Sequence, residues 1–197
     1  TGAILGANYT GGLVGRLNAT ENTVHQTFVI NNSYNTGDVS GLNYTGGLTG
    51  GFNGTGTTSS IQDSYVTGNI TTPDWSQTGN DVGGLVGLNS GAITLNRSRY
   101  SGNIATKGSY IGGLIGRSTF AGNTQINASY TSGSITNDPF NTLNNEVGVG
   151  GLVGYIYNNA GYADIDASYS SMNINTASYS YDGTSSMPVG SNGSGGL

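Results

Sequence analysis

The sequence has no cysteine and few charged side chains. Of the 197 residues, none is Cys, five are Lys or Arg, and 8% are charged. The absence of cysteine excludes disulfides and thiolate metal sites, and it is compatible with either an oxidising or a reducing compartment. With a formal net charge of -5, the chain lacks the clustered cations that a protein needs to bind a phosphate backbone. We therefore expect no nucleic-acid partner.

Long apolar runs are missing too. No stretch approaches the roughly 18 apolar residues that cross a bilayer, and no charged region followed by an apolar one opens the sequence. We expect no membrane span in this segment. The sequence starts and stops inside phrases that recur along it, and reading its end into its beginning gives Gly-Gly-Leu-Thr-Gly, the residues found at 46–50. This pattern favours a fragment of a longer tandem-repeat chain.

Residues suited to catalysis are scarce. His25 is the only histidine, so no pair of histidines can bind zinc and the serines give no hydrolase triad. Asp164 and Asp166 lie two apart, hence on the same side of a strand, where two carboxylates can bind Ca²⁺ or act as an acid and a base. Their position in a repeat favours a solvated pair over these two alternatives. We expect no enzyme activity, no cofactor and no metal ion.

Glycine, in contrast, is abundant, with 36 residues. The phrase Gly-Gly-Leu-x-Gly accounts for many of them, and a truncated copy ends at Leu197. The residue before each complete copy is β-branched, which favours an extended chain entering the glycines. The complete copies occupy 11–15, 46–50, 83–87, 112–116 and 150–154.

A second phrase follows each complete copy of the first. Its consensus is apolar-polar-x-Ser-Tyr-x-x-Gly-x-apolar, with Arg99 at the Tyr position in the third copy and Met172 at the Gly position in the fifth. The segments between the phrases, such as 54–60 and 137–146, vary in length and are rich in turn residues, so they are interpreted as surface loops. The copies of the second phrase occupy 30–39, 61–70, 95–104, 126–135 and 165–174.

Both phrases suit strands, because they are short, β-branched and interrupted by glycine. One repeat has too few apolar residues to bury alone, so we predict an all-β fold, a β-solenoid or closely related β-helix-like stack of about five Gly-rich repeats with essentially no helix. Glycine is expected to turn the corners at positive φ and to let neighbouring coils approach. The predicted anchors are one inward leucine per repeat and a packed tyrosine ladder, with a sugar-stacking stripe as the alternative for the tyrosines: Leu13, Leu48, Leu85, Leu114, Leu152, Tyr34, Tyr65, Tyr130 and Tyr169.

The paired phrases, "GGLVG" and "SYxxG", resemble the GLUG motif, a repeat named for its Gly-Leu-x-Gly core and found in large secreted bacterial adhesins and some surface proteases. The resemblance spans about 10–174, and the departures at Arg99 and Met172 concern individual repeats. It implies an extracellular, repetitive β-rich stalk or adhesive segment. It transfers no catalytic residue, since the peptidase motif of such proteases lies elsewhere in their chains.

Asparagine occurs in many N-x-[ST] sequons, the acceptors of N-linked glycans. Two of them lie at matching sites of the phrase "NYTGGL", and three share the polar slot of the second phrase. That slot must point outward if it carries sugar, and an asparagine ladder is the alternative. The candidate glycosylation sites are Asn8, Asn18, Asn31, Asn43, Asn53, Asn69, Asn96, Asn127 and Asn192.

Two functional classes follow from these patterns. The first is a structural or adhesive segment of an extracellular filament or cell-surface stalk, which associates end to end with itself and meets glycans or neighbouring cell surfaces. The second is a carbohydrate-binding or polysaccharide-degrading β-helix that uses residues 97–117. In that region the cations and nearby aromatic residues are Arg97, Arg99, Tyr100, Lys107, Tyr110 and Arg117.

Overall fold

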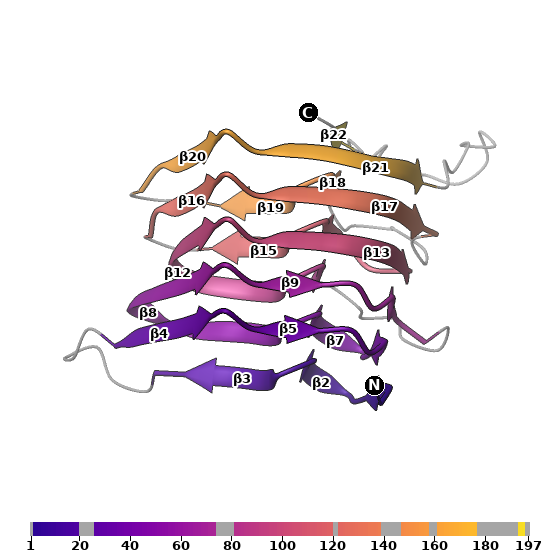
Figure 1. Ribbon diagram of the computed structural model, residues 1–197, viewed down its shortest axis with the longest axis horizontal. Coiled ribbons are helices and arrows are strands. Elements are labelled where there is room, and N and C mark those ends of the chain that lie inside the picture. Colours follow the sequence, from indigo (N-terminus) through magenta and orange to yellow (C-terminus); the bar gives the residue numbers. More distant parts are fainter. Residues whose placement is uncertain are drawn as a thin grey trace, which may run out of the picture.

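The computed structural model describes residues 2–19, 26–73, 81–119, 122–138, 147–157, 161–176 and 193–195. These residues form 22 strands and no helix, and therefore no helix among them is long and apolar enough to cross a membrane. The chain winds as a coil whose successive turns stack along one axis, with the first strands at one end and the last at the other (Figure 1). The predicted all-β solenoid is confirmed.

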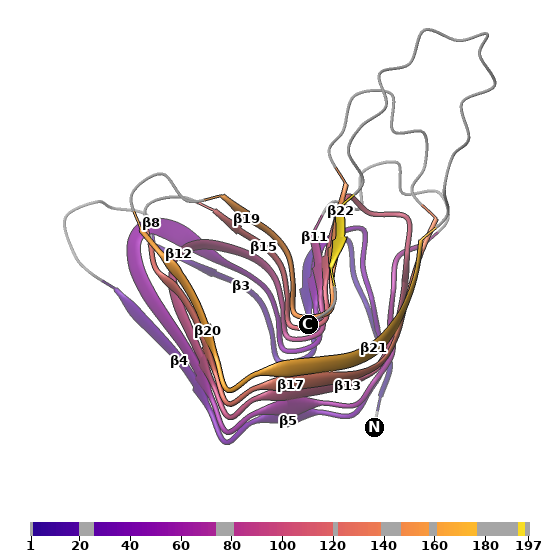
Figure 2. The same cartoon turned by 90° about the horizontal axis from the view of Figure 1, so that it is seen from above.

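The coil is right-handed. On the near face of Figure 1 the chain runs from left to right while it rises toward the C-terminal end, and Figure 2 shows the same winding from above. A right-handed crossover is the usual connection between parallel strands because it matches the natural strand twist. Each turn passes through three parallel sheets of six or eight strands, which we call sheets A, B and C.

Sheet B contains the entry into each Gly-Gly-Leu-x-Gly phrase. Its register places Gly46 beside Gly11 and Gly83, and Gly112 beside Gly83 and Gly150. Each repeat of the sequence is therefore one coil of the solenoid. The strands are β2 (Asn8–Gly11), β7 (Asn43–Gly46), β11 (Asp81–Gly83), β14 (Tyr110–Gly112), β18 (Gly148–Gly150) and β22 (Gly193–Gly195).

Sheet C receives the chain after the glycines. In the second coil it contains one long strand through 54–60, so the prediction of a loop there is wrong. Thr58 lies in this strand and pairs with Ala92, beyond an irregularity in register at Ser90. The small residues Gly, Ser and Thr allow the backbone to keep its hydrogen bonds to the neighbouring coils, although a segment of this composition is usually found in loops. The strands are β3 (Val14–Asn18), β4 (Thr27–Asn31), β8 (Thr49–Gln62), β12 (Val86–Asn96), β15 (Ile115–Thr119), β16 (Thr124–Asn127), β19 (Val153–Tyr157) and β20 (Ala163–Asp166).

Sheet A contains the second half of the second phrase. Of the other predicted loop, 137–146, only Asn137, at the end of a strand, and Asp138 lie within the described residues. Met172 stays in register with Gly133, and its side chain packs against the core. The strands are β1 (Ile4–Leu5), β5 (Tyr34–Asn35), β6 (Val39–Ser40), β9 (Tyr65–Val66), β10 (Ile70–Thr71), β13 (Arg99–Thr106), β17 (Tyr130–Asn137) and β21 (Tyr169–Thr176).

The core consists of axial ladders of apolar side chains. Leu48, Leu85 and Leu114 are fully buried and Leu152 is nearly so, whereas Leu13, in the first coil, is 46% exposed. Leucine is not the single inward anchor that we predicted, because sheets A and C also supply buried rows, and each row needs its own apolar residue in every coil. One row in sheet A joins Val39, Ile70, Ile104 and Ile135 in register.

The glycines of the first phrase are required by close approach rather than by positive φ. None of them has positive φ. Among the described glycines, those with φ between +20° and +160° are Gly54, Gly56 and Gly133. At Gly84 a Cβ atom would overlap the Gly113 carbonyl oxygen and the ring of Tyr100, and at Gly87 it would lie 2.7 Å from the Thr45 backbone nitrogen. The prediction of positive-φ corners is therefore wrong for this phrase, and the prediction of close packing between coils is confirmed.

The positive-φ corners lie in the second phrase instead. The residue before each serine adopts the left-handed conformation that most side chains disfavour, and it turns the chain from sheet C into sheet A. Only small, polar or solvent-facing side chains occupy the position. The five residues, with φ between 46° and 49°, are Asn32, Asp63, Arg97, Ala128 and Ala167.

The serine after each corner forms a continuous hydrogen-bond ladder along the axis. The Ser64 backbone N–H donates to Ser98 Oγ at 3.2 Å, and the Ser98 N–H donates to Ser129 Oγ at 3.1 Å. Each hydroxyl donates in turn to the carbonyl oxygen two residues before it, as Ser98 Oγ does to Asn96 at 3.0 Å. The serine of the second phrase thus links a buried N–H of one coil to a carbonyl of the next.

A Ser98→Ala substitution is expected to lower the free energy of unfolding by roughly 1–3 kcal/mol, because it leaves the buried Ser64 N–H without an acceptor. Ser33→Ala is the matched control. The Ser33 hydroxyl donates to Asn31 O, but no N–H of the described residues donates to it, so a smaller loss is expected. Urea unfolding followed by circular dichroism measures both, and equal losses would contradict the ladder.

Candidate functional site

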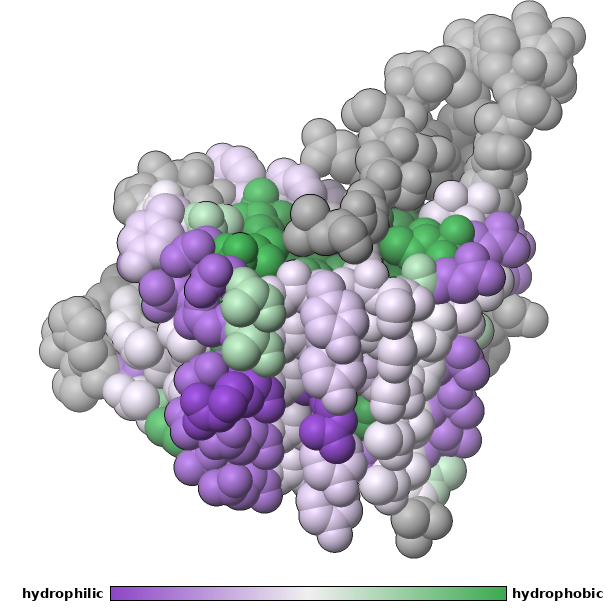
Figure 3. Space-filling view, turned by 45° about the horizontal axis from the view of Figure 1, so that its top comes forward, coloured by the Kyte–Doolittle hydropathy of each residue, from purple (hydrophilic) through white to green (hydrophobic). Residues whose placement is uncertain are grey.

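The predicted tyrosine ladder lies on the outer face of sheet A. Tyr34 and Tyr65 stack with ring centroids 5.2 Å apart and planes within 7°, and Tyr130 and Tyr169 stack at 5.3 Å and within 5°. Arg99 takes the place of tyrosine in the third coil and holds its guanidinium 4.4 Å above the Tyr65 ring. In Figure 3, side chains of similar hydropathy line up in columns that run along the solenoid axis. The rings pack on one another outside the core, and Tyr34 and Tyr169 remain more than half exposed.

The structure distributes the cations of 97–117 over different faces. Arg97, at a corner, donates from Nε and Nη2 to the Asp63 carboxylate at 2.7 and 2.8 Å, and these hydrogen bonds lower the pKa of the Asp63 carboxyl below its ordinary value. Arg99 belongs to the tyrosine ladder. Tyr100 is fully buried in the core. Arg117 and Tyr110 meet on one surface, where the Arg117 guanidinium lies against the Tyr110 ring.

That surface is a concave strip running along the solenoid axis between sheet B and the first part of sheet C, where the backbone bends inward (Figure 2). Two rows of residues face each other across it. In each coil, an eight-residue stretch contains the Gly-Gly-Leu-x-Gly phrase; its first residue belongs to the row on sheet B and its last residue to the row on sheet C. We call it the tyrosine notch. The sheet B row is Tyr9, Tyr44, Asp81 and Tyr110, and the sheet C row is Arg16, Gly51, Leu88, Arg117 and Tyr155.

The N-terminal half of the notch is a stack of two rings and one cation. Tyr9 and Tyr44 have ring centroids 4.5 Å apart, and the Arg16 guanidinium lies 4.5 Å from the centre of the Tyr9 ring. Both tyrosines have positive φ, 54° and 51°. A bulky side chain rarely adopts this conformation, and strained residues of this kind concentrate at functional surfaces.

The C-terminal half contains a groove of about 420 Å³, and three of its seven lining residues are tyrosines. The Tyr110 and Tyr155 rings lie 4.6 Å apart at 33°, and the Tyr155 and Tyr157 rings are parallel within 4° at 6.5 Å. The Arg117 guanidinium lies 5.2 Å from the centre of the Tyr110 ring. The groove is lined by Leu88, Ser90, Tyr110, Arg117, Thr119, Tyr155 and Tyr157.

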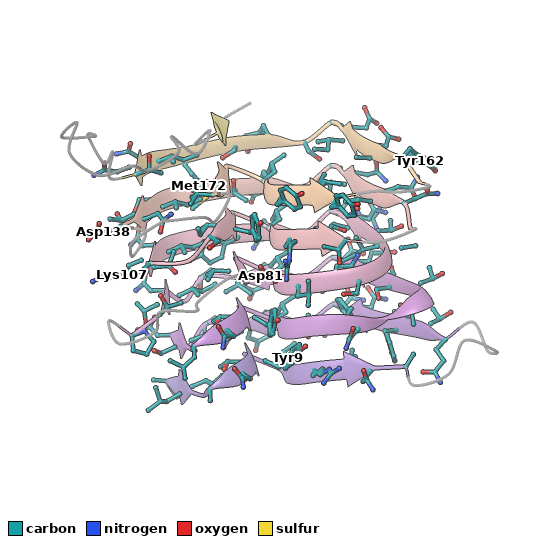
Figure 4. All side chains as sticks on the ribbon, turned by 180° about the vertical axis from the view of Figure 1, so that it is seen from behind. Tyr9, Asp81, Lys107, Asp138, Tyr162 and Met172 are labelled. Atoms are coloured by element: carbon teal, nitrogen blue, oxygen red, sulfur yellow. The ribbon has the colours of Figure 1, made fainter. Side chains whose placement is uncertain are left out.

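A buried ion pair lies beside this groove. Arg117 Nη2 is 2.8 Å from Asp81 Oδ2, and the Asp81 side chain is fully buried while that of Arg117 is 26% exposed. The contact is electrostatic, because neither carboxylate oxygen nor Arg117 Nε has a well-directed hydrogen bond among the described residues. Burial raises the pKa of the Asp81 carboxyl to about 7, against the opposing influence of the Arg117 charge. Figure 4 shows Asp81 on the same face as Tyr9.

The burial of Asp81 makes the stability of the protein depend on pH. The folded-state pKa of Asp81 lies above its unfolded-state value, so the folded protein binds more protons between the two values. We expect the free energy of unfolding to fall as the pH rises from about 4 to about 7, by up to about 4 kcal/mol from this group. Asp81→Asn should lose this contribution. Urea unfolding at both ends of the window measures it, and an identical pH dependence in both proteins would contradict it.

The candidate glycosylation sites divide into two groups. Some of the asparagines hydrogen-bond to each other between coils: Asn43 Nδ2 donates to Asn8 Oδ1 at 2.7 Å, and Asn53 Nδ2 to Asn18 Oδ1 at 3.2 Å. Asn69 Oδ1 accepts from Asn103. The slot of the second phrase points outward, and its three members are exposed or half-buried: Asn31, Asn96 and Asn127.

The remaining predicted residues play no part in the notch. Asp164 and Asp166 are both exposed on β20, and Asp166 lies beside Asn127 in register. They do not join a cluster of three potential metal ligands anywhere in the described ranges. Asn192 and His25 lie outside the described residues.

Sequence analysis did not identify the notch, although a signal was available. The stretches 9–16 and 110–117 both read Tyr-x-Gly-Gly-Leu-x-Gly-Arg, and in both the arginine lies over the tyrosine of its own stretch. Seven positions separate the two residues, so only the tight fold of the glycines brings them together.

Comparison with known proteins adds no further identification. No protein-family model, no curated protein and no solved structure matches this chain.

Proposed function

We propose that this chain is a structural and adhesive segment of an extracellular filament or cell-surface stalk, of the kind that the GLUG-motif resemblance implies. One observation carries the proposal: the same two phrases recur in register in coil after coil, and each coil hydrogen-bonds to the coils directly before and after it. Such an architecture extends indefinitely by adding coils, and its stability is a sum over neighbouring pairs.

The surface of the solenoid is consistent with a stalk. The outer face of sheet A is a column of stacked tyrosines with a single arginine, and the polar slot of the second phrase forms a parallel column. The described corners of the second phrase are short and hydrogen-bonded from coil to coil, as a stiff stalk requires. The outward asparagines of that slot, Asn31, Asn96 and Asn127, are the best-placed of the proposed glycan acceptors.

End-to-end association is part of the proposal. The two ends of the described coils leave core positions uncovered: Leu13 is 46% and Ile165 is 38% exposed, whereas their neighbours one coil inward, Leu48 and Ile126, are fully buried. A further coil stacked on either end, from a second copy or from adjoining sequence, would bury these positions and pair the open strand edges. At the N-terminal end the open edge includes β1 and β4, which carry Leu5 and Val29 on their outer faces. Unpaired edges and exposed apolar residues favour association.

Solution scattering over a range of protein concentrations, with electron microscopy of the same samples, tests this role. We expect rods that lengthen with concentration. A double variant, Leu5→Lys with Val29→Lys, should keep the β-rich circular dichroism spectrum and form shorter rods or none. A stubby monomer at every concentration would overturn the proposal.

A further inference from the structure

We propose that the C-terminal half of the tyrosine notch is a binding site for a linear, electrically neutral glycan. This inference names the ligand of the adhesive role proposed above, and it rests on that role. The site is the 420 Å³ groove between β14 on one wall and β15 and β19 on the other.

The aromatic surface of the groove fits the apolar faces of sugar rings. Tyr155 and Tyr157 lie two residues apart on β19, with ring planes parallel within 4° and centroids 6.5 Å apart. Tyr110 packs on Tyr155, with centroids 4.6 Å apart and planes tilted by 33°, so a sugar meets the outer surfaces of this ring cluster and does not enter between Tyr110 and Tyr155. The C–H groups of a pyranose face pack on aromatic rings, and a site lined by aromatic residues with a few polar groups is the usual form of a small-ligand pocket.

Polar groups for the sugar hydroxyls lie around this ring cluster. The Arg117 side chain is a quarter exposed and lines the groove, so its guanidinium can donate to a sugar hydroxyl. Thr119 and Ser90 supply hydroxyl oxygens to the groove lining. A ligand with hydroxyl groups around an apolar ring face therefore meets complementary chemistry on both counts.

The charge of the site favours a neutral glycan over an acidic one. Arg117 is the cation of the groove lining, and the carboxylate of Asp81 lies 2.8 Å from it. The pair carries no net charge while Asp81 is ionised, which holds above about pH 7, so the binding measurements are made at pH 8.5. An acidic polysaccharide would meet no uncompensated cation in the groove, and the chain as a whole has a formal charge of -5, which repels polyanions.

The direction of the notch favours a linear chain of sugars. On the N-terminal side of Asp81, the sheet B row carries two more rings along the solenoid axis, Tyr44 and Tyr9, which stack on each other. Figure 4 views this face and shows Tyr9 and Asp81 at different heights along the axis. An extended oligosaccharide that occupies the groove therefore points toward further ring surfaces of the same strip.

Isothermal titration calorimetry with four hexasaccharides tests the site: cellohexaose, mannohexaose, chitohexaose in its N-acetylated form, and hexagalacturonate as the acidic probe. We expect at least one neutral probe to bind and hexagalacturonate not to bind. Tyr155→Ala and Tyr157→Ala should each weaken binding about tenfold, the effect of losing one ring contact of roughly 1.4 kcal/mol. Tyr155→Phe, which keeps the ring, should retain most of the affinity.

Tyr169→Ala is the matched control, since Tyr169 is an exposed, stacked tyrosine on sheet A, and it should bind as the unmodified protein does. Binding of no probe, binding of hexagalacturonate alone, or equal losses in the Tyr155 and Tyr169 variants would overturn the inference. Rods that bind no glycan would refute this site and leave the filament role intact. Glycan binding by a chain that forms no rods would refute the filament role and keep the site.

Discussion

A Leu85→Asp variant is expected to lose several kcal/mol of unfolding free energy, enough to abolish the fold of the middle coils. Leu85 is fully buried, and its backbone bridges Leu48 in one coil and Leu114 in the next. Aspartate would remove the apolar contacts of the leucine and place an unpaired charge in the centre of the ladder. The whole stability of a domain is only about 5–15 kcal/mol.

Thr58→Asp is the control for this substitution. Thr58 lies in a strand of the neighbouring coil, but its side chain is exposed, so the change should stay within about 0.5 kcal/mol. Thermal unfolding followed by circular dichroism compares the two variants. Equal shifts in melting temperature would contradict the assignment of Leu85 to the core.

A Gly84→Ala variant is expected to be nearly as damaging, although it adds a single methyl group. That methyl would overlap the carbonyl oxygen of Gly113 in the next coil and would lie 2.7 Å from the Cβ of Tyr100, across the interior. Neither neighbour can withdraw, because one is backbone and the other is a fully buried ring. The coil must widen, which breaks packing on both sides.

Gly2→Ala adds the same methyl group where no atom lies within 4 Å, and it should leave stability within about 0.5 kcal/mol. Urea unfolding of the two variants, with the midpoint and the slope recorded separately, distinguishes a loss of stability from a change in compactness. A Gly84→Ala protein as stable as Gly2→Ala would mean that the coils do not approach as closely as the structure has them.

The sequence allowed the coil to be predicted, because a phrase that returns with the same residues at the same places must occupy equivalent positions. The leucines and tyrosines of the two phrases were accordingly assigned to axial rows. Composition was a poorer guide to the segment 54–60, since glycine, serine and threonine suit a loop and also suit a strand whose hydrogen bonds come from coils on either side. The neighbouring coil decides between them, and it is not visible in a local window.

Two features depended on three-dimensional packing and were missed for that reason. The left-handed corners fall on Asn32, Ala128 and similar residues, whose identities do not demand positive φ. The notch depends on Tyr110 and Arg117, which are separated in sequence by the glycines that bring them together. Asp81 occupies the tyrosine position of that row, and only its burial beside Arg117 distinguishes it from a surface carboxylate.

The serine ladder also determines how the molecule responds to tension. Each link joins residues about one coil apart, as Ser64 and Ser98 are 34 positions apart, and no link among those between neighbouring serines skips a coil. A force that pulls on one end of the chain therefore breaks the bonds of one coil before it loads the next. Each released coil of about 34 residues lengthens the extended chain by roughly 110 Å. The solenoid thus yields coil by coil, in steps whose lengths follow the 31 to 39 positions between neighbouring serines, and it dissipates work at each step.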